Sequence, residues 1–300
     1  MTQTSAFHFE SLVWDWPIAI YLFLIGISAG LVTLAVLLRR FYPQAGGADS
    51  TLLRTTLIVG PGAVILGLLI LVFHLTRPWT FWKLMFHYSF TSVMSMGVML
   101  FQLYMVVLVL WLAKIFEHDL LALQQRWLPK LGIVQKVLSL LTPVHRGLET
   151  LMLVLAVLLG AYTGFLLSAL KSYPFLNNPI LPVLFLFSGI SSGAAVALIA
   201  MAIRQRSNPH STEAQFVHRM EIPVVWGEIF LLVAALGGGF WTWWFWLGVA
   251  GLGLIVPMLL KPWVNRSSGI PAVLAACGAS LVGVLMLRFF ILYAGQLMVA

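Results

Sequence analysis

The chain has 300 residues, of which 61% are hydrophobic and only 9% are charged, and its mean hydropathy is +1.00. A water-soluble domain carries roughly 25% charged residues, so this composition excludes a soluble protein and predicts one embedded in a lipid bilayer. One cysteine, Cys277, excludes disulfides within the chain, cysteine-ligated clusters and zinc fingers, and the net charge of +8 lies in loops, which argues against nucleic-acid binding.

Eight apolar segments approach the roughly 20 residues that a helix needs to cross the hydrocarbon layer. In chain order they are Ile18–Leu38, Leu57–Leu75, Phe90–Ala113, Leu148–Leu170, Ile180–Ile203, Ile222–Leu236, Phe240–Leu260 and Ile270–Leu292. Residues 1–16 contain no Lys or Arg and no short apolar core, so no cleaved signal peptide is expected before the first span. Glycines 237–239 separate the sixth and seventh segments. We interpret them as a tight turn between two helices, with one tilted helix and a re-entrant segment as the alternative.

A short glycine motif occurs twice. Residues 26–30 read Gly-Ile-Ser-Ala-Gly, and residues 189–193 read Gly-Ile-Ser-Ser-Gly. The repeat predicts two tandem four-helix bundles, the first formed by residues 1–147 with 148–175 and the second by residues 176–300. Small residues four positions apart favour close helix packing. The competing interpretation, an intramembrane serine protease, needs a histidine base, but His74 is placed roughly four helical turns from the depth of Ser191.

Basic residues are distributed unevenly between the two sides of the predicted membrane. Only Arg77, Lys83 and Lys171 lie in the loops after the second, fourth and sixth spans, whereas thirteen basic residues lie in the loops after the first, third, fifth and seventh. Cytoplasmic loops carry an excess of Lys and Arg, so both termini are predicted to be periplasmic. The long cytoplasmic loop of residues 114–147 either lies on the membrane surface or is an ordinary connection.

Polar residues gather at the predicted periplasmic ends of the first, second and fourth spans. The set comprises Asp15, Trp16, Tyr21, His74, Arg77 and Tyr162. Ionisable groups next to hydrocarbon are costly and are therefore candidates for function. A belt of interfacial aromatic residues explains the tryptophan, but such a belt requires neither Asp15 nor His74, so we favour a functional role for that pair.

Three further charged residues are predicted within the spans or at their ends. Glu149 is placed at the cytoplasmic end of the fourth span, Glu228 in the sixth and Arg288 in the outer third of the eighth. They are candidates for a proton route or for structural contacts between helices, and both interpretations stay open. Because Glu228 is placed near the cytoplasmic side, no direct pair with Arg288 is expected.

The polar set suits the oxidation of a quinol, whose two hydroxyl groups lose protons as the ring is oxidised. A carboxylate and a histidine accept protons near neutral pH, tyrosine hydroxyls hold the ring oxygens, and apolar helix faces accept an isoprenoid tail. Haem in a membrane cytochrome is held by histidine pairs inside helices, whereas only His74 of the seven histidines falls on a predicted span. No haem, iron–sulfur cluster or metal site is therefore expected. The alternatives are a secondary transporter, with its site at the midplane between the halves, and a structural anchor for a periplasmic complex.

The sequence also resembles the polysulfide-reductase-type NrfD family of quinol-oxidising membrane subunits. The resemblance covers nearly the whole chain and is carried by residues 16–26, 74–82, 92–97, 162–168 and 184–195. The Arg-Pro-x-x-Phe-Trp run at 77–82 and the Met-Ser-x-Gly run at 94–97 are specific in combination. The resemblance implies an all-α integral membrane fold of eight transmembrane helices in two tandem four-helix bundles, with a quinol site in the first bundle that faces the periplasm.

The resemblance also implies roles for residues and partners. The quinone-contacting tyrosines of the family fall on Tyr21 and Tyr162, and an acidic position of the family falls on His74. The implied substrate is menaquinol, in a bacterial inner membrane. The implied partner is a periplasmic four-cluster iron–sulfur protein, which passes electrons to a multihaem cytochrome c nitrite reductase that forms ammonia. The family further implies a longer connection around residues 233–240 than this chain has.

Overall fold

The computed structural model describes residues 15–74, 78–86, 88–90, 92–127, 133–169, 176–204, 211–236, 245–260 and 270–297. The described residues form helices and their connections, without a strand. In chain order the elements are α1 (Trp16–Phe41), α2 (Thr51–His74), η1 (Pro78–Thr80), α3 (Phe81–Phe86), α4 (Val93–Ile115), α5 (Glu117–Trp127), α6 (Ile133–Leu141), α7 (His145–Ser168), α8 (Leu181–Arg204), α9 (Thr212–Leu236), the π-helix η2 (Phe245–Ile255) and α11 (Ile270–Leu297). The predicted all-helical class is confirmed for this part of the sequence.

Six of the described helices are long and apolar enough to cross a membrane, namely α1, α2, α4, α7, α8 and, over Ile270–Ala294, α11. They coincide with the first five predicted spans and the eighth. The start of α1 lies beside the end of α2, where Asp15 faces His74. The end of α1 lies beside the start of α7, where Arg39 contacts Glu149. We call these two ends of the bundle the Asp15 end and the Arg39 end.

The sixth predicted span differs from the expectation, and the seventh is described only in part. α9 begins at Thr212, well before the predicted start at Ile222. Its polar first turn packs on the start of α2, where the backbone N–H groups of Thr51 and Leu52 donate to Glu213 Oε2 at 3.0 and 3.4 Å. The described part of the seventh segment, Phe245–Leu260, is apolar, and residues 240–244 of the predicted span lie outside the described residues. The predicted glycine turn at 237–239 lies outside the described residues.

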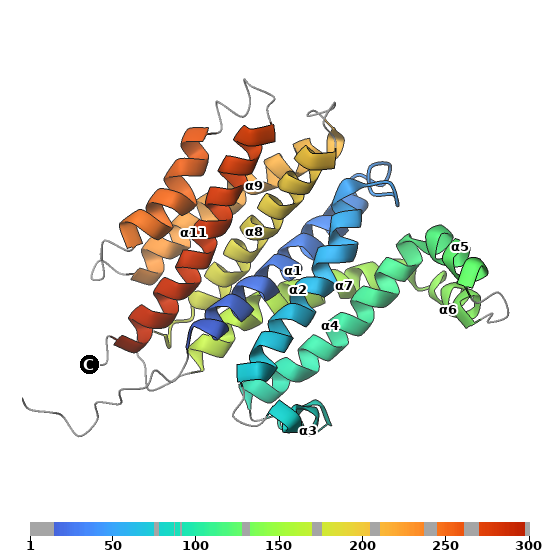
Figure 1. The fold of residues 1–300 in the computed structure, drawn as a ribbon, viewed down its shortest axis with the longest axis horizontal. Coiled ribbons are helices and arrows are strands. Elements are labelled where there is room, and N and C mark those ends of the chain that lie inside the picture. Colours follow the sequence, from blue (N-terminus) through green and yellow to red (C-terminus); the bar gives the residue numbers. More distant parts are fainter. Residues whose placement is uncertain are drawn as a thin grey trace, which may run out of the picture.

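Helix α1 occupies the centre of the bundle and packs against α2, α7, α8 and α11 (Figure 1). The two copies of the glycine motif face each other where α1 crosses α8. A Cβ atom on Gly30 would lie 2.0 Å from the carbonyl oxygen of Gly189, and one on Gly193 would lie 2.6 Å from the carbonyl carbon of Gly30. Because those neighbours are backbone atoms, they cannot move aside as a flexible side group could. The packing role predicted for the motif is confirmed.

The serines of the glycine motif make structural hydrogen bonds. Ser28 Oγ donates to the carbonyl oxygen of Gly60 at 2.8 Å and lies 2.9 Å from the hydroxyl of Tyr104. Ser192 Oγ donates to the carbonyl oxygen of Gly189 one turn earlier, at 2.8 Å. The contacts of Ser28 tie α1 to α2 and α4. The boundary between two bundles near residue 175 stays a prediction.

Candidate functional site

The Asp15 end carries an acid–base pair formed by the antiparallel packing of α1 and α2. Asp15 precedes α1, whose first turn is set by Pro17, and makes no side-chain capping hydrogen bond to that turn. His74 is the last residue of α2, and its Nε2 lies 3.9 Å from Asp15 Oδ2. The side chains of His74 and Asp15 are 37% and 48% exposed. The predicted pair is therefore together, and both groups are open to a ligand.

Tyr21 lies deeper along the same contact between α1 and α2. It is buried, with 2% of its surface exposed, and its ring would touch a Cβ atom on Gly67 at 3.5 Å. Gly67 and His74 are seven residues apart and share one face of α2. The phenol of Tyr21 therefore lies about two turns below the Asp15–His74 pair, on the same side of α2.

An aromatic row connects Tyr21 to Tyr162 through Phe101. The ring centroids of Tyr21 and Phe101 are 6.0 Å apart, and those of Phe101 and Tyr162 are 5.9 Å apart with the rings perpendicular. Separations of this size are typical of favourable aromatic packing. The row joins α1, α4 and α7, so the two predicted tyrosines belong to one cluster even though they come from helices far apart in the sequence.

Tyr162 is held against the start of α4. Its hydroxyl donates to the carbonyl oxygen of Val93 at 3.3 Å, and a Cβ atom on Gly97 would lie 1.8 Å from the same hydroxyl. The glycine of the Met-Ser-x-Gly run is thus the residue that leaves room for the tyrosine ring. Sequence reasoning noted this run but missed the role of Gly97, and it missed Phe101 altogether, because an aromatic residue inside an apolar span carries no distinguishing signal.

Two other residues were predicted for the set, Trp16 and Arg77. Trp16 is 57% exposed, which agrees with an interfacial residue. Arg77 lies outside the described residues. The structure therefore brings together Asp15 with His74 at the surface and Tyr21 with Tyr162 beneath them.

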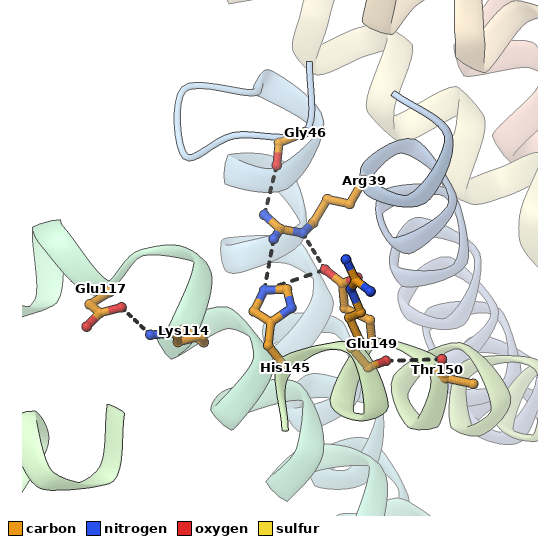
Figure 2. Close-up of polar contacts among 8 residues, drawn as sticks. Arg39, Gly46, Lys114, Glu117, His145, Glu149 and Thr150 are labelled. Carbon is orange, nitrogen blue, oxygen red and sulfur yellow. Dashed lines mark hydrogen bonds and ion pairs between the residues drawn. The ribbon is translucent and has the colours of Figure 1, made fainter. Parts of the chain in front are cut away.

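Glu149, a candidate for the proton route, is engaged in a polar cluster at the Arg39 end. Figure 2 shows Arg39 reaching from the end of α1 towards the start of α7. Its Nε donates to Glu149 Oε1 at 2.7 Å, and its Nη1 donates to the carbonyl oxygen of Gly46 at 2.8 Å. Arg39 Nη2 also lies 3.0 Å from Nε2 of His145, which in turn is 3.7 Å from Glu149 Oε1. This arrangement favours the structural role for Glu149.

Glu228 and Arg288 are buried, with 4% and 1% of their surfaces exposed. Arg288 Nη2 donates to the carbonyl oxygen of Phe185 at 3.1 Å, and its guanidinium carbon lies 3.8 Å from the centroid of the Phe185 ring. No ion pair of 4.0 Å or less is described between Glu228 and Arg288.

The structure places Glu228 farther along its helix than the predicted sixth span does. Because α9 begins at Thr212 rather than at Ile222, Glu228 lies about 24 Å along the helix. It is therefore nearer the Asp15 end than the Arg39 end. A role for either residue in a proton route stays a prediction.

Within the described residues, no group of three or more His, Cys, Asp or Glu side chains is placed to hold a metal ion. The chemistry available at the Asp15 end is instead that of proton acceptors and hydroxyl donors beside apolar helix faces. Such a site suits a hydrophobic ligand with two titratable hydroxyl groups.

Comparison with known proteins gives consistent matches over the whole sequence. The model of the family described as "Polysulphide reductase, NrfD" matches residues 4–236 and 232–300. The sequence is 94% identical to "Protein NrfD" of Escherichia coli (strain K12) over 100% of both proteins. It is 45% identical to "Protein NrfD homolog" of Haemophilus influenzae over 98% of both, and 36% identical to the C subunit of the polysulfide reductase of Wolinella succinogenes over 96% of both.

The same comparisons bear on the short connection after α9. The alignment with the Escherichia coli protein has 318 positions, 18 more than the 300 residues present here. The family match is divided in two, and its parts meet at residues 232–236. Both findings agree with the expectation that relatives have a longer connection around residues 233–240.

Proposed function

This chain belongs to the polysulphide reductase NrfD family, and on that premise we propose that it is the quinol-oxidising membrane subunit of a redox complex. The observation that carries the proposal is the Asp15–His74 pair, which is partly exposed and lies above Tyr21 and Tyr162 at one end of the bundle. The family supports a membrane subunit of a redox complex, and the site supports a quinol as its substrate.

The proposed reaction converts one quinol into a quinone, two protons and two electrons. Asp15 and His74 accept the protons as the ring is oxidised, because a carboxylate and an imidazole are the side chains best suited to accept protons near neutral pH. Tyr21 and Tyr162 orient the ring oxygens. With one cysteine, this protein cannot ligate an iron–sulfur cluster through cysteines, so the electrons pass to a cluster of a partner protein.

We propose that the Asp15 end is periplasmic and that both termini lie on that side of a bacterial inner membrane. The basic residues that follow the odd-numbered spans support this orientation, since cytoplasmic loops are rich in Lys and Arg. The proposed fold has eight spans, with α9 and the segment Phe245–Leu260 supplying the two that are not among the six long apolar helices.

The proposed physiological route leads from menaquinol to nitrite. The relatives named NrfD are 94% and 45% identical to this protein, whereas the polysulfide reductase subunit is 36% identical, so we infer the nitrite branch of the family. The partner is then a periplasmic four-cluster iron–sulfur protein, which passes electrons to a multihaem cytochrome c nitrite reductase that forms ammonia.

The segment around α3 is the proposed docking surface for that partner. Its aromatic side chains are exposed, and these are Trp79, Phe81, Trp82, Phe86, Tyr88 and Phe90. Gln102 of α4 holds the segment in place, because its Nε2 donates to the carbonyl oxygen of Met85 at 3.1 Å and its Oε1 accepts from the Tyr88 hydroxyl. The surface lies at the Asp15 end, where electrons leave the proposed site.

Cross-linking of the assembled complex tests the docking surface. A lysine-reactive reagent is expected to join Lys83 in α3 to the iron–sulfur partner, while Lys136 in α6, at the opposite end of the bundle, gives no such product. Mass spectrometry of the cross-linked peptides identifies which lysines are joined. Products that involve Lys136 and not Lys83 would place the partner on the other side of the membrane.

Proteoliposomes test the proposed function. They contain quinol and reduce an external acceptor through the partner protein. The change Asp15→Asn removes one proton acceptor and is expected to slow quinol-dependent reduction at least about tenfold, with the complex intact. Asp49→Asn is the matched control, because Asp49 lies at the Arg39 end and pairs with Arg54 at 3.1 Å. Wild-type turnover in Asp15→Asn would instead favour the structural-anchor alternative.

The same proteoliposomes report where the protons go. Asp15 and His74 are partly exposed at the Asp15 end. We therefore propose that protons leave on the periplasmic side and that turnover forms no membrane potential. A membrane potential that forms in the unaltered protein and disappears in Glu149→Gln or Glu228→Gln would show a route from the cytoplasmic side.

A secondary transporter is the second candidate function, because Glu228 and Arg288 are buried charges among α1, α8, α9 and α11.

A further inference from the structure

The connection between α4 and α7 folds into a helical hairpin, formed by α5 and α6, at the Arg39 end. In Figure 1 the hairpin lies beside the end of α4, away from α8, α9 and α11. It is fixed to α4 by Lys114, whose Nζ pairs with Glu117 of α5 and donates to Thr142 Oγ1, just after α6, at 2.9 Å. The end of α6 is therefore level with the last turn of α4.

The last turn of α4 lies at the boundary between the hydrocarbon core and the lipid headgroups. Helix α4 has 23 residues and is about 35 Å long, slightly longer than the roughly 30 Å of hydrocarbon that it crosses. Its last turn, and with it the end of α6, lies in the interfacial layer. A helix at this depth can present an apolar face to lipid and a polar face to water.

Helix α6 has an apolar face that the described residues do not cover. Val137 and Leu140 are 39% and 73% exposed, and Val144, just beyond the helix, is 56% exposed. Val137 and Leu140 are three residues apart and lie on one face of α6, and Val144 follows in the turn that leads into α7. Leu138, at 1% exposure, packs inward instead. The hairpin thus has a buried apolar face and a second, exposed apolar stripe.

The charges around the stripe are mostly basic. Lys136 and Arg146 flank it and are exposed, and Arg126 at the end of α5 is exposed as well. Of the two acidic residues of α5, Glu117 is paired with Lys114, and Asp119 is exposed beside His118. Exposed lysine and arginine next to an apolar stripe are complementary to anionic phospholipid headgroups.

We propose that α6 is an interfacial anchor, whose stripe of Val137, Leu140 and Val144 inserts into the lipid leaflet at the Arg39 end, while Lys136 and Arg146 bind anionic phospholipid headgroups. The anchor holds the end of α4, the helix that carries Gly97 and Phe101 near its other end. The proposal depends neither on quinol chemistry nor on which end of the bundle is periplasmic.

Depth-dependent fluorescence quenching tests the anchor. In a Cys277→Ala background, Leu140→Cys carries an environment-sensitive fluorophore, and Ser139→Cys, on the polar face of α6, is the matched control. The protein is reconstituted in nanodiscs of phosphatidylcholine with and without phosphatidylglycerol. Doxyl-labelled lipid is expected to quench the label at position 140 at least about threefold more than the label at position 139, while aqueous iodide shows the reverse order. Val144→Cys provides a second position in the stripe.

The charge reversals Lys136→Glu and Arg146→Glu, made together, test the headgroup contact. They are expected to weaken lipid quenching at position 140 in discs with phosphatidylglycerol and to leave it unchanged in phosphatidylcholine alone. Equal quenching at positions 139 and 140 would overturn the anchor. Protection of position 140 from both quenchers would also overturn it, because a protein surface would then cover the stripe. An unchanged signal in the charge-reversed protein would overturn the headgroup contact.

Discussion

The change Gly30→Leu is expected to abolish assembly of the folded protein in the membrane. A Cβ atom at this position would lie 2.0 Å from the carbonyl oxygen of Gly189 and 2.9 Å from the Cα atom of Ile190. Both neighbours are backbone atoms of α8, so the two central helices must move apart. Overpacking of a close-packed core costs about 1–3 kcal/mol where side chains can shift, and the cost is larger where only backbone can move.

The matched control for this variant is Gly62→Leu in α2. A Cβ atom on Gly62 meets nothing within 4 Å, and leucine is a better helix former than glycine by up to about 1 kcal/mol. Size-exclusion chromatography of the fluorescently tagged protein in detergent measures the monodisperse fraction. Equal yields of the two variants would mean that α1 and α8 do not cross as closely as the glycine contacts require.

The double change Tyr21→Phe with Tyr162→Phe is expected to lower quinol turnover about 100-fold, with the complex still assembled. Each hydroxyl that orients the quinol ring is expected to contribute about 1–1.5 kcal/mol, and 1.4 kcal/mol corresponds to about a factor of ten in rate. Both substitutions keep the aromatic rings, so the row through Phe101 stays packed. Steady-state reduction of the iron–sulfur partner by a soluble quinol analogue measures the loss.

Tyr104→Phe is the matched control for the double variant. Tyr104 is fully buried in α4, and its hydroxyl contacts Ser28 rather than the proposed site. Loss of this hydroxyl is expected to lower stability by about 1 kcal/mol without a change in turnover. If the double variant keeps the turnover of the Tyr104→Phe protein, the tyrosines do not orient the quinol.

Several parts of the fold follow from the sequence because each rests on a strong local signal. Six of the eight predicted apolar segments form long helices, and the repeated motif predicted close helix packing, which the contact of Gly30 with Gly189 shows. The polar first turns of α9 were missed, because their stability comes from the contact of Glu213 with the start of α2, a residue pair 162 positions apart. The hydropathy pattern contains no trace of such a contact.

In the candidate site, too, some features were predictable from the sequence and others were not. Asp15 and His74 were predictable, because ionisable groups next to hydrocarbon are costly and an aromatic belt requires neither of them, and because antiparallel neighbours bring those span ends together. The packing of Tyr162 over Gly97 and against Phe101 was not, since it depends on the rotation of α4 relative to α7. The relative positions of the helices decide which of the many apolar and aromatic residues contact one another.

A structure of the assembled complex with a bound quinone analogue decides where the quinol binds. The ring of the analogue is expected at the Asp15 end, within reach of the Asp15 carboxylate, the His74 imidazole and the hydroxyl of Tyr21 or Tyr162. An iron–sulfur cluster of the partner is expected above the α3 segment. A ring bound at the Arg39 end, or beside Arg288 between α8 and α11, would show that the quinol site lies elsewhere.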